Sequence, residues 1–192
     1  MINPGIGSFG KYSGLARIST GSARLRSSTK AYYQRSENNF RFLNTSLGIN
    51  PEWERRENSQ FAQTGVVQEL YLKASENAIL SGRFWYQSAN RNLPVPITVP
   101  VMNPPEKQYD ESFRSMINIE TTRKETEYRI TGAFISDHLH YTNQSVSIDS
   151  RNLSRNAVFR ASVSKTLGNS TRLRIDFNDE LNLINSNNYI SK

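Results

Sequence analysis

The sequence predicts an all-β protein: an antiparallel up-and-down segment of a transmembrane β-barrel, with about eight strands and an open, incomplete wall. Apolar and polar residues alternate over short segments along most of the chain, as in strands with one apolar face and one wet face. The breaks between these segments are by turns short and long, which is typical of outer-membrane barrels. The 192 residues form one domain, and the lack of cysteine excludes a disulfide scaffold and a thiolate zinc site.

Eight alternating segments define the expected strands. In the clearest of them, 79–90, Leu80 and Phe84 point to one side and Arg83 to the other. The remaining strands are expected at 9–20, 24–35, 65–74, 111–121, 127–136, 156–165 and 171–178. Each is close to the roughly 9 to 11 residues that a tilted strand needs to cross a bilayer. We expect the apolar faces to look outward to lipid and the charged faces inward.

Short and long connections alternate between these segments. Short turns are expected near 21–23, 75–77, 123–125 and 168–170. Long loops are expected at 36–64, 89–109 and 138–155, and the polar segment from Asp179 to Lys192 is expected to be a fourth. Segment 89–109 holds five of the seven prolines, which cannot donate to a strand ladder.

The net charge of +7 raises the question of a nucleic-acid partner. The basic residues are spread over many strands instead of forming one basic face, so the sequence favours a solvated inner wall and no nucleic-acid binding. Tyrosines near strand ends match either an interfacial girdle or ordinary β-propensity: Tyr12, Tyr33, Tyr86 and Tyr128. No signal peptide follows Met1, and an outer-membrane protein needs one, so we expect the chain to lack its natural N-terminus.

Motifs of catalysis are missing from the sequence, and we expect no enzyme, no cofactor and no metal site. There is no glycine-rich phosphate loop, nucleophile elbow or HExxH motif. His138 and His140 lie two residues apart beside Asp137 and so have donor atoms for a metal. A polar loop is the simpler interpretation of this segment.

Two groups of residues are candidates for ligand binding. The loop 36–64 combines aromatic and cationic side chains that suit a large, partly anionic ligand, foremost Trp53, Arg55 and Arg56. The alternative is a loop that only packs on its neighbours. Arg83 and Trp85, on the expected inner wall, form the second group, and they are equally suited to packing against another part of the protein.

Two stretches of sequence resemble TonB-dependent outer-membrane receptors. Residues 7–12, Gly-Ser-Phe-Gly-Lys-Tyr, are similar to the first barrel strand after the plug of such receptors. Residues 68–73, Gln-Glu-Leu-Tyr-Leu-Lys, followed by 80–87, Leu-Ser-Gly-Arg-Phe-Trp-Tyr-Gln, resemble paired barrel strands of receptors from Bacteroidetes-like bacteria, including vitamin B12 receptor-like members. The resemblance covers most of the chain, although its motifs are diffuse.

The resemblance implies uptake of a scarce nutrient across the outer membrane, with a siderophore, cobalamin or a glycan as ligand. Its implied partners are outer-membrane lipid, the receptor's own plug domain and TonB. The family has an N-terminal plug, a TonB box and a barrel of about 22 strands. This sequence shows neither plug nor TonB box. It ends Tyr-Ile-Ser-Lys and lacks a C-terminal strand that closes the barrel and ends in an aromatic residue. We therefore expect residues 1–192 to be an internal piece of the barrel that starts just after the plug.

Two other functions remain open at this point. A complete small barrel of eight strands would have a structural or adhesive role. A soluble β-sandwich would be a binding module, for example for carbohydrate, but it would need polar outer faces on both sheets and similar loops at both ends. The alternation of long and short connections disfavours the sandwich.

Overall fold

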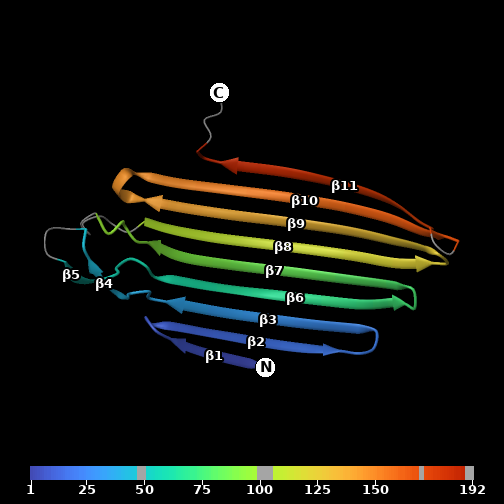
Figure 1. The fold of residues 1–192 in the computed structure, drawn as a ribbon, viewed down its shortest axis with the longest axis horizontal. Helices are drawn as coiled ribbons and strands as arrows, with labels where there is room; N and C mark the ends of the chain where they lie inside the picture. The colour runs from blue at the N-terminus through green and yellow to red at the C-terminus, as the bar shows by residue number, and fades with distance from the viewer. Residues whose placement is uncertain (47–50, 99–105, 169–170, 189–192) are drawn as a thin grey trace.

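A single long antiparallel sheet dominates the computed structural model, which describes residues 1–46, 51–98, 106–168 and 171–188 (Figure 1). Nine strands follow one another in the order β1-β2-β3-β6-β7-β8-β9-β10-β11, so the sheet is a meander. They are β1 (Ile2–Gly7), β2 (Lys11–Gly21), β3 (Leu25–Ser36), β6 (Phe61–Ser75), β7 (Ala78–Leu93), β8 (Glu106–Arg123), β9 (Thr126–Asn143), β10 (Ile148–Leu167) and β11 (Thr171–Ser186). A separate hairpin, β4 (Arg41–Asn44) and β5 (Glu52–Arg55), is inserted between β3 and β6.

The sheet does not close into a barrel, because β1 and β11 form its two edges. Both of its faces are open: among the described residues, Ala89 is the one buried hydrophobic residue. The solvent-accessible area is 13843 Å², whereas a folded monomer of 21.9 kDa is expected to expose roughly 9300 Å². The excess area is that of a single-layer sheet, which in the described residues has no hydrophobic core of its own.

All eight predicted strands are present, and so is the open antiparallel architecture. The predicted short turns join β2 to β3, β6 to β7 and β8 to β9. The fourth turn, between β10 and β11, is described only at Gly168, since residues 169–170 lie outside the described residues. We call the end of the sheet that holds these four connections the turn end and the opposite end the loop end; they lie right and left in Figure 1.

Two of the predicted loops are wrong. Strand β9 continues to Asn143 and β10 begins at Ile148, so the loop expected at 138–155 is reduced to the single 3-10 turn η1 (Gln144–Val146) and its flanking residues. The polar segment from Asp179 is also strand, since β11 continues to Ser186. Near the loop end both faces of β9 and β10 are mostly polar, and in β11 asparagines and serines surround the apolar residues, so period-two alternation no longer marks the strands clearly.

The other two loops are shorter than predicted. In segment 36–64, strand β6 already begins at Phe61, and hairpin β4–β5 occupies part of the remainder. In segment 89–109, β7 ends at Leu93 and β8 begins at Glu106, while residues 99–105 lie outside the described residues. Pro94 and Pro96 are outside any strand, as proline chemistry predicts.

Strand β1 was not predicted, and the strand expected from residue 9 begins at Lys11. Pro4 lies in β1, where an edge position leaves its missing N–H without consequence for the sheet. Residues 8–10 form the turn between β1 and β2, with positive φ angles of 59° at Phe9 and 68° at Gly10. The segment that resembles a barrel strand therefore contains this turn. In the described part of the chain, no helix is long and apolar enough to cross a membrane.

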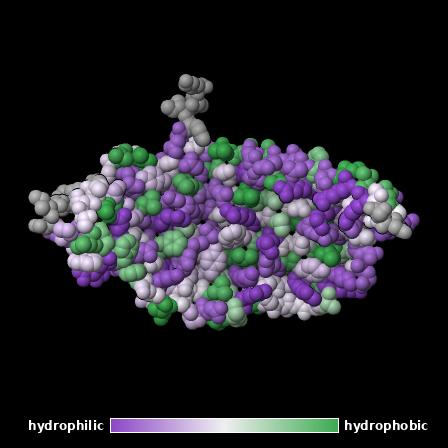
Figure 2. Space-filling view, in the orientation of Figure 1, coloured by the Kyte–Doolittle hydropathy of each residue, from purple (hydrophilic) through white to green (hydrophobic). Residues whose placement is uncertain are grey.

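Strand register divides the sheet into an apolar face and a polar face. Residues of the apolar face lie side by side across six neighbouring strands in the row Leu72, Leu80, Ile119, Ile130, Ala161 and Phe177. Most of these side chains are exposed in the chain alone. The view in Figure 2 shows one face of the molecule, on which hydrophilic side chains predominate and hydrophobic ones are dispersed among them.

The apolar face carries an uncharged band that crosses the sheet, and the band is wider in β6 and β7 than in the other strands. Its uncharged stretch covers Tyr12–Thr20 in β2, Leu25–Tyr33 in β3, Phe113–Thr121 in β8 and Tyr128–Ser136 in β9. Each stretch is about nine residues long, close to what a tilted strand needs to cross a bilayer. Charged or ionisable residues follow on the same face toward the loop end: Glu111, His138 and Arg155. Asp179 on the edge strand β11 is an exception, because it lies opposite Phe159 within the band.

Candidate functional site

The centre of the polar face holds the second predicted group, Arg83 and Trp85, at mid-strand in β7. The Trp85 ring lies beneath a guanidinium from β8, with Cζ of Arg114 at 4.9 Å from the ring centroid. The other side of that guanidinium faces β9, where its Nη2 lies 3.8 Å from Oδ1 of Asp137. A cation over an indole is held by the ring quadrupole, so this contact orients both side chains on the face.

A tyrosine from β3 connects Trp85 to its neighbours. The Tyr32 hydroxyl donates to Oε1 of Gln87 at 2.9 Å and accepts from Nε1 of Trp85 at 3.4 Å. Nε2 of Gln63 in β6 donates to the same hydroxyl at 3.5 Å. The tyrosine ring lies directly over Gly65, where an added Cβ would be 2.4 Å from the ring. Glycine at this position is what allows the ring to lie flat across β6 and reach β7.

A hollow of about 560 Å³ opens on the polar face toward the turn end, next to this cluster. Its lining includes three arginines, Arg17, Arg26 and Arg83, and the carboxylate of Glu69. Arg83 Nη2 lies 2.8 Å from Oε1 of that carboxylate, and Nζ of Lys30 lies 3.5 Å from Oε2. Arg83 is thus one member of a cationic group from β2, β3 and β7 that surrounds the carboxylate of Glu69 in β6.

The first predicted group lies elsewhere, on the hairpin β4–β5 beyond the loop end of the sheet (Figure 1). Trp53 is 64% exposed, and the guanidinium Cζ of Arg41 lies 5.6 Å from its ring centroid. Arg55 is paired with Arg41 across the hairpin, and the backbone N–H of Arg56 donates to the carbonyl of Phe40 at 2.8 Å. The structure therefore brings Trp53 and Arg55 together in one hairpin but leaves them apart from Arg83 and Trp85 in mid-sheet.

The hairpin is tied to the sheet by polar and aromatic contacts. Asn44, which is only 2% exposed, donates from Nδ2 to Oε2 of Glu54 and to the carbonyl of Ile97, each at 3.2 Å. Phe40 packs between Phe9 and Phe42, with ring centroids 6.0 Å and 6.3 Å apart. These contacts fix the position of the hairpin, and the exposed indole of Trp53 faces solvent.

The two histidines lie in strand β9, not in a loop. They share the apolar side of the sheet, above the uncharged band, as their spacing predicts for an extended segment. Nε2 of His140 lies 2.8 Å from Oδ1 of Asp149, while the His138 ring packs edge-on against Tyr109. Among the described residues no group of three or more histidine, aspartate or glutamate side chains is placed to hold a metal.

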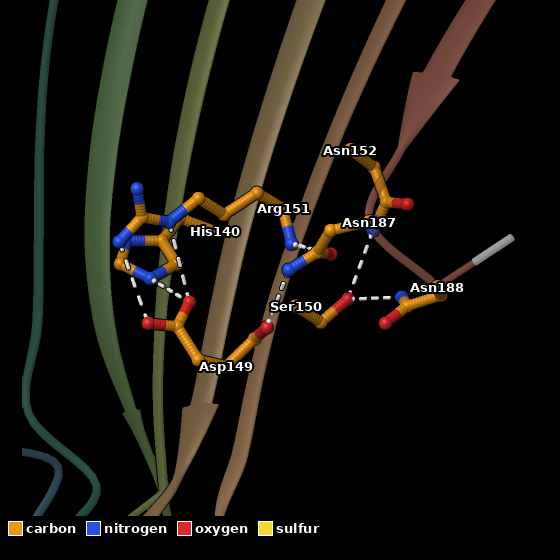
Figure 3. Close-up of polar contacts among 7 residues, drawn as sticks. All are labelled: His140, Asp149, Ser150, Arg151, Asn152, Asn187 and Asn188. Atoms are coloured by element: carbon orange, nitrogen blue, oxygen red, sulfur yellow. Dashed lines mark hydrogen bonds and ion pairs between the residues drawn. The ribbon is translucent and has the colours of Figure 1, made fainter. Parts of the chain in front are cut away.

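His140 belongs to a hydrogen-bonded cluster that joins β9, β10 and the end of β11 (Figure 3). We call this cluster the polar staple; its members are His140, Asp149, Arg151 and Asn187. The carboxylate of Asp149 also accepts from Nε of Arg151 at 3.3 Å, and its backbone carbonyl accepts from Nδ2 of Asn187 at 2.7 Å. Hydrogen bonds from Arg151 and His140 hold the pKa of the exposed Asp149 carboxyl below its usual range. The side chains satisfy one another, so the staple orders the strand ends and presents no open binding site.

Sequence comparison finds no matching protein-family model and no matching curated protein.

Proposed function

We propose that this chain is a wall segment of the β-barrel of a TonB-dependent outer-membrane receptor, which takes up a scarce nutrient such as a siderophore, cobalamin or a glycan. The observation that carries the proposal is the uncharged, exposed band on one face of the sheet. It continues across the strands, is about nine residues wide in β2, β3, β8 and β9, and is bordered by charged or ionisable residues on the same face toward the loop end. Exposed apolar surface of this extent indicates an interface, and a band of this width fits a bilayer.

Backbone chemistry supports a membrane setting. Within the sheet every inner strand is paired on both sides, from β2 to β10, so its N–H and C=O groups meet the ladder instead of hydrocarbon. The two edges, β1 and β11, present unpaired groups, and in lipid each would cost several kcal/mol. Further strands beside both edges remove this cost, and a barrel of about 22 strands supplies them.

The open sheet gives less support to the two alternatives. A complete eight-stranded barrel, structural or adhesive, needs pairing between the first and last strands, which here are the separate edges β1 and β11. A β-sandwich needs a second sheet packed on the apolar face, and in the described residues the only other sheet is the hairpin β4–β5.

In this proposal the polar face lines the barrel interior, and the loop end lies outside the cell. The hairpin residues Trp53, Arg55 and Arg56 contact the incoming ligand first, and Arg83 and Trp85 face the ligand or the plug inside. Outer-membrane lipid, the plug and TonB are the proposed partners. No catalytic step is proposed for any of these residues.

Two neighbouring residues of β8 provide a direct test. Met116 lies on the polar face and Ile117 on the apolar face, and both are exposed in the chain alone. Because the chain has no cysteine, Met116→Cys and Ile117→Cys each give one attachment site for a spin label. In membranes of expressing cells, the label at 117 should collide with oxygen dissolved in lipid, and the label at 116 with a water-soluble nickel complex. Equal nickel accessibility at both positions would overturn the membrane placement.

A further inference from the structure

We propose that the hollow on the polar face, beside Arg17, Arg26 and Arg83, binds an oxyanion. This oxyanion is a carboxylate or phosphate group of the small, soluble molecule that is transported. We call this hollow the arginine hollow. The inference rests on the proposed function only in that the polar face is taken as the water-filled side of the wall. The hollow lies near the turn end, far from the hairpin, and is thus a second site in addition to the predicted capture loop.

Strand register brings the cations together. Arg17 of β2 is directly opposite Lys30 of β3. One row nearer the turn end, Ser28 of β3 faces Glu69 of β6, which in turn faces Arg83 of β7. Arg26 lies in the next row, opposite Tyr71. Four cationic side chains from three strands thus occupy successive rows around one concavity of about 560 Å³.

The negative charge at the hollow is too small to balance the four cationic side chains. Glu69 is the only carboxylate in its lining, and it is shared between Arg83 and Lys30. The Arg17 guanidinium instead contacts two hydroxyls, with Nε at 3.2 Å from Oγ of both Ser19 and Ser28. The Arg26 guanidinium lies over the Tyr71 ring, with Cζ 6.0 Å from its centroid. The described residues therefore leave a net positive hollow with two guanidinium groups directed at neutral partners.

This set of donors matches an oxyanion. A guanidinium presents parallel N–H groups at the spacing of two carboxylate or phosphate oxygens, and hydroxyls beside it supply further donors. A neutral sugar or an apolar ligand would leave the positive charge uncompensated. Among small ligands, one with two or more negative groups is favoured, because Arg17 and Arg26 lie in different rows and on different strands.

The test measures anion binding by the full-length protein, of which this chain is a part in our proposal, inserted in lipid nanodiscs. Pyrophosphate and citrate serve as probes for phosphate and carboxylate, and titration calorimetry gives the dissociation constants. The double variant Arg17→Gln/Arg26→Gln should weaken binding of the preferred probe by roughly tenfold or more. Arg160→Gln is the matched control: it also removes a guanidinium from the polar face, one that donates to Asn178 at 2.8 Å, outside the hollow.

Binding of either probe with loss only in the double variant supports the site, and the stronger probe identifies the anion class. Binding of neither probe, or equal affinities in the double variant and the control, overturns it. Circular dichroism of both variants verifies that the sheet is retained. The spin-label test at positions 116 and 117 separately decides the membrane placement, so failure of the hollow and failure of the proposed function are distinguishable.

Discussion

The polar face differs between the amino-terminal part of the sheet, β2–β7, and the carboxy-terminal part, β8–β11. In β2–β7 four cations face one carboxylate, Glu69, around the arginine hollow. Within β8–β11 cations and carboxylates alternate, and the described residues form four ion pairs on this face, at 3.1 Å, 2.5 Å, 2.7 Å and 3.8 Å: Arg129–Glu120, Arg172–Glu127, Arg174–Asp176 and Arg114–Asp137. The two parts also differ at the loop end, where the first carries the hairpin β4–β5 and the second only the short turn η1.

The difference indicates that a ligand is more readily bound on the amino-terminal part of the polar face. Paired charges on an exposed face keep it hydrated at little gain in stability, typically about 0 to 1 kcal/mol for each pair. Unpaired cations in a concavity have no such balance and attract an anion. Both candidate binding features, the hollow and the hairpin, occur in the same part of the chain.

The first and largest expected effect concerns the apolar face, on which the two parts of the sheet should behave alike. Phe159→Arg in β10 and Leu70→Arg in β6 each place a charge on the uncharged band. Leu70→Arg should cost about 2 to 4 kcal/mol near the bilayer midplane, and Phe159→Arg should cost less, because Asp179 lies opposite it. The measurement is folding into lipid vesicles at graded urea, with Arg160→Ser on the polar face as the control. Equal folding of Leu70→Arg and the control would show that the faces have been assigned the wrong way round.

A second prediction concerns the glycines of the two parts. Gly65→Ala places a methyl group 2.4 Å from the Tyr32 ring, so the ring must move and its bonds to Gln87 and Trp85 are lost. We expect a cost of about 1 to 3 kcal/mol. Gly132→Ala in β9 meets nothing within 4 Å and should be tolerated. The fluorescence of Trp85, in a Trp53→Phe background, should change in the first variant and not in the second.

The third prediction concerns the hairpin. Replacing Trp53, Arg55 and Arg56 by alanine should weaken capture of the transported nutrient about tenfold, because an exposed indole and two guanidinium groups are lost from the anchored hairpin. The measurement is binding of cyanocobalamin, a ferric siderophore and an oligosaccharide panel to cells that express the full-length receptor. Unchanged affinity for the bound member of this panel, at normal surface expression, would remove the hairpin from the site.

The fourth prediction compares Glu69, the carboxylate of the hollow, with Glu120, a carboxylate of an exposed ion pair in β8–β11. Glu69→Gln leaves Arg83 and Lys30 without their shared partner, so pyrophosphate or citrate should bind a few-fold more tightly. Glu120→Gln breaks one exposed pair with Arg129 and should change stability by about 0 to 1 kcal/mol and anion affinity not at all. An equal response of the two variants would erase the distinction between the two parts of the polar face.

The smallest effect is expected at the polar staple of the carboxy-terminal part. The pKa of Asp149 is lowered in the folded chain, so its stabilising effect is present above the ordinary aspartate pKa of about 3.9 and is lost as pH falls through the lowered value. Protection from hydrogen exchange at the loop end of β9 and β10, corrected for the intrinsic pH dependence of amide exchange, should be steady above about pH 5 and decrease in stronger acid. Asp149→Asn should abolish this acid-dependent step, and a step that persists in this variant would assign it to another group.

How far the sequence predicts this fold depends on where the strand lies relative to the uncharged band. Inside the band one face is apolar and the other polar, so period-two alternation marks each strand, as at 79–90 and 156–165. Beyond it both faces are mostly polar, and the same strands continue unmarked to Asn143 and from Ile148. In β11 the alternation Leu181-Asn182-Leu183 is present but is obscured by the surrounding asparagines and serines.

The candidate site was predictable in part. Alternation alone assigns Arg83 and Trp85 to the wet face of one strand, and the structure places them there. Their neighbours Arg17 and Arg114 come from other strands, and only the register of the ladders brings them alongside. Register depends on turn geometry and on pairing along the whole strand, which composition does not reveal.

The extension of the strands past the uncharged band has a consequence for electrostatics if the wall spans the membrane as proposed. From Ser136 to Asn143, β9 rises roughly 20 Å beyond the band at about 3.3 Å per residue. The screening length of physiological salt is only about 8 Å. These strand extensions would therefore hold Arg55 and its neighbours on the hairpin more than one screening length away from the charged lipid headgroups, so the headgroups would not affect them. Attraction of an anionic nutrient to the hairpin would then depend on the ionic strength of the medium and not on the lipid composition of the membrane below.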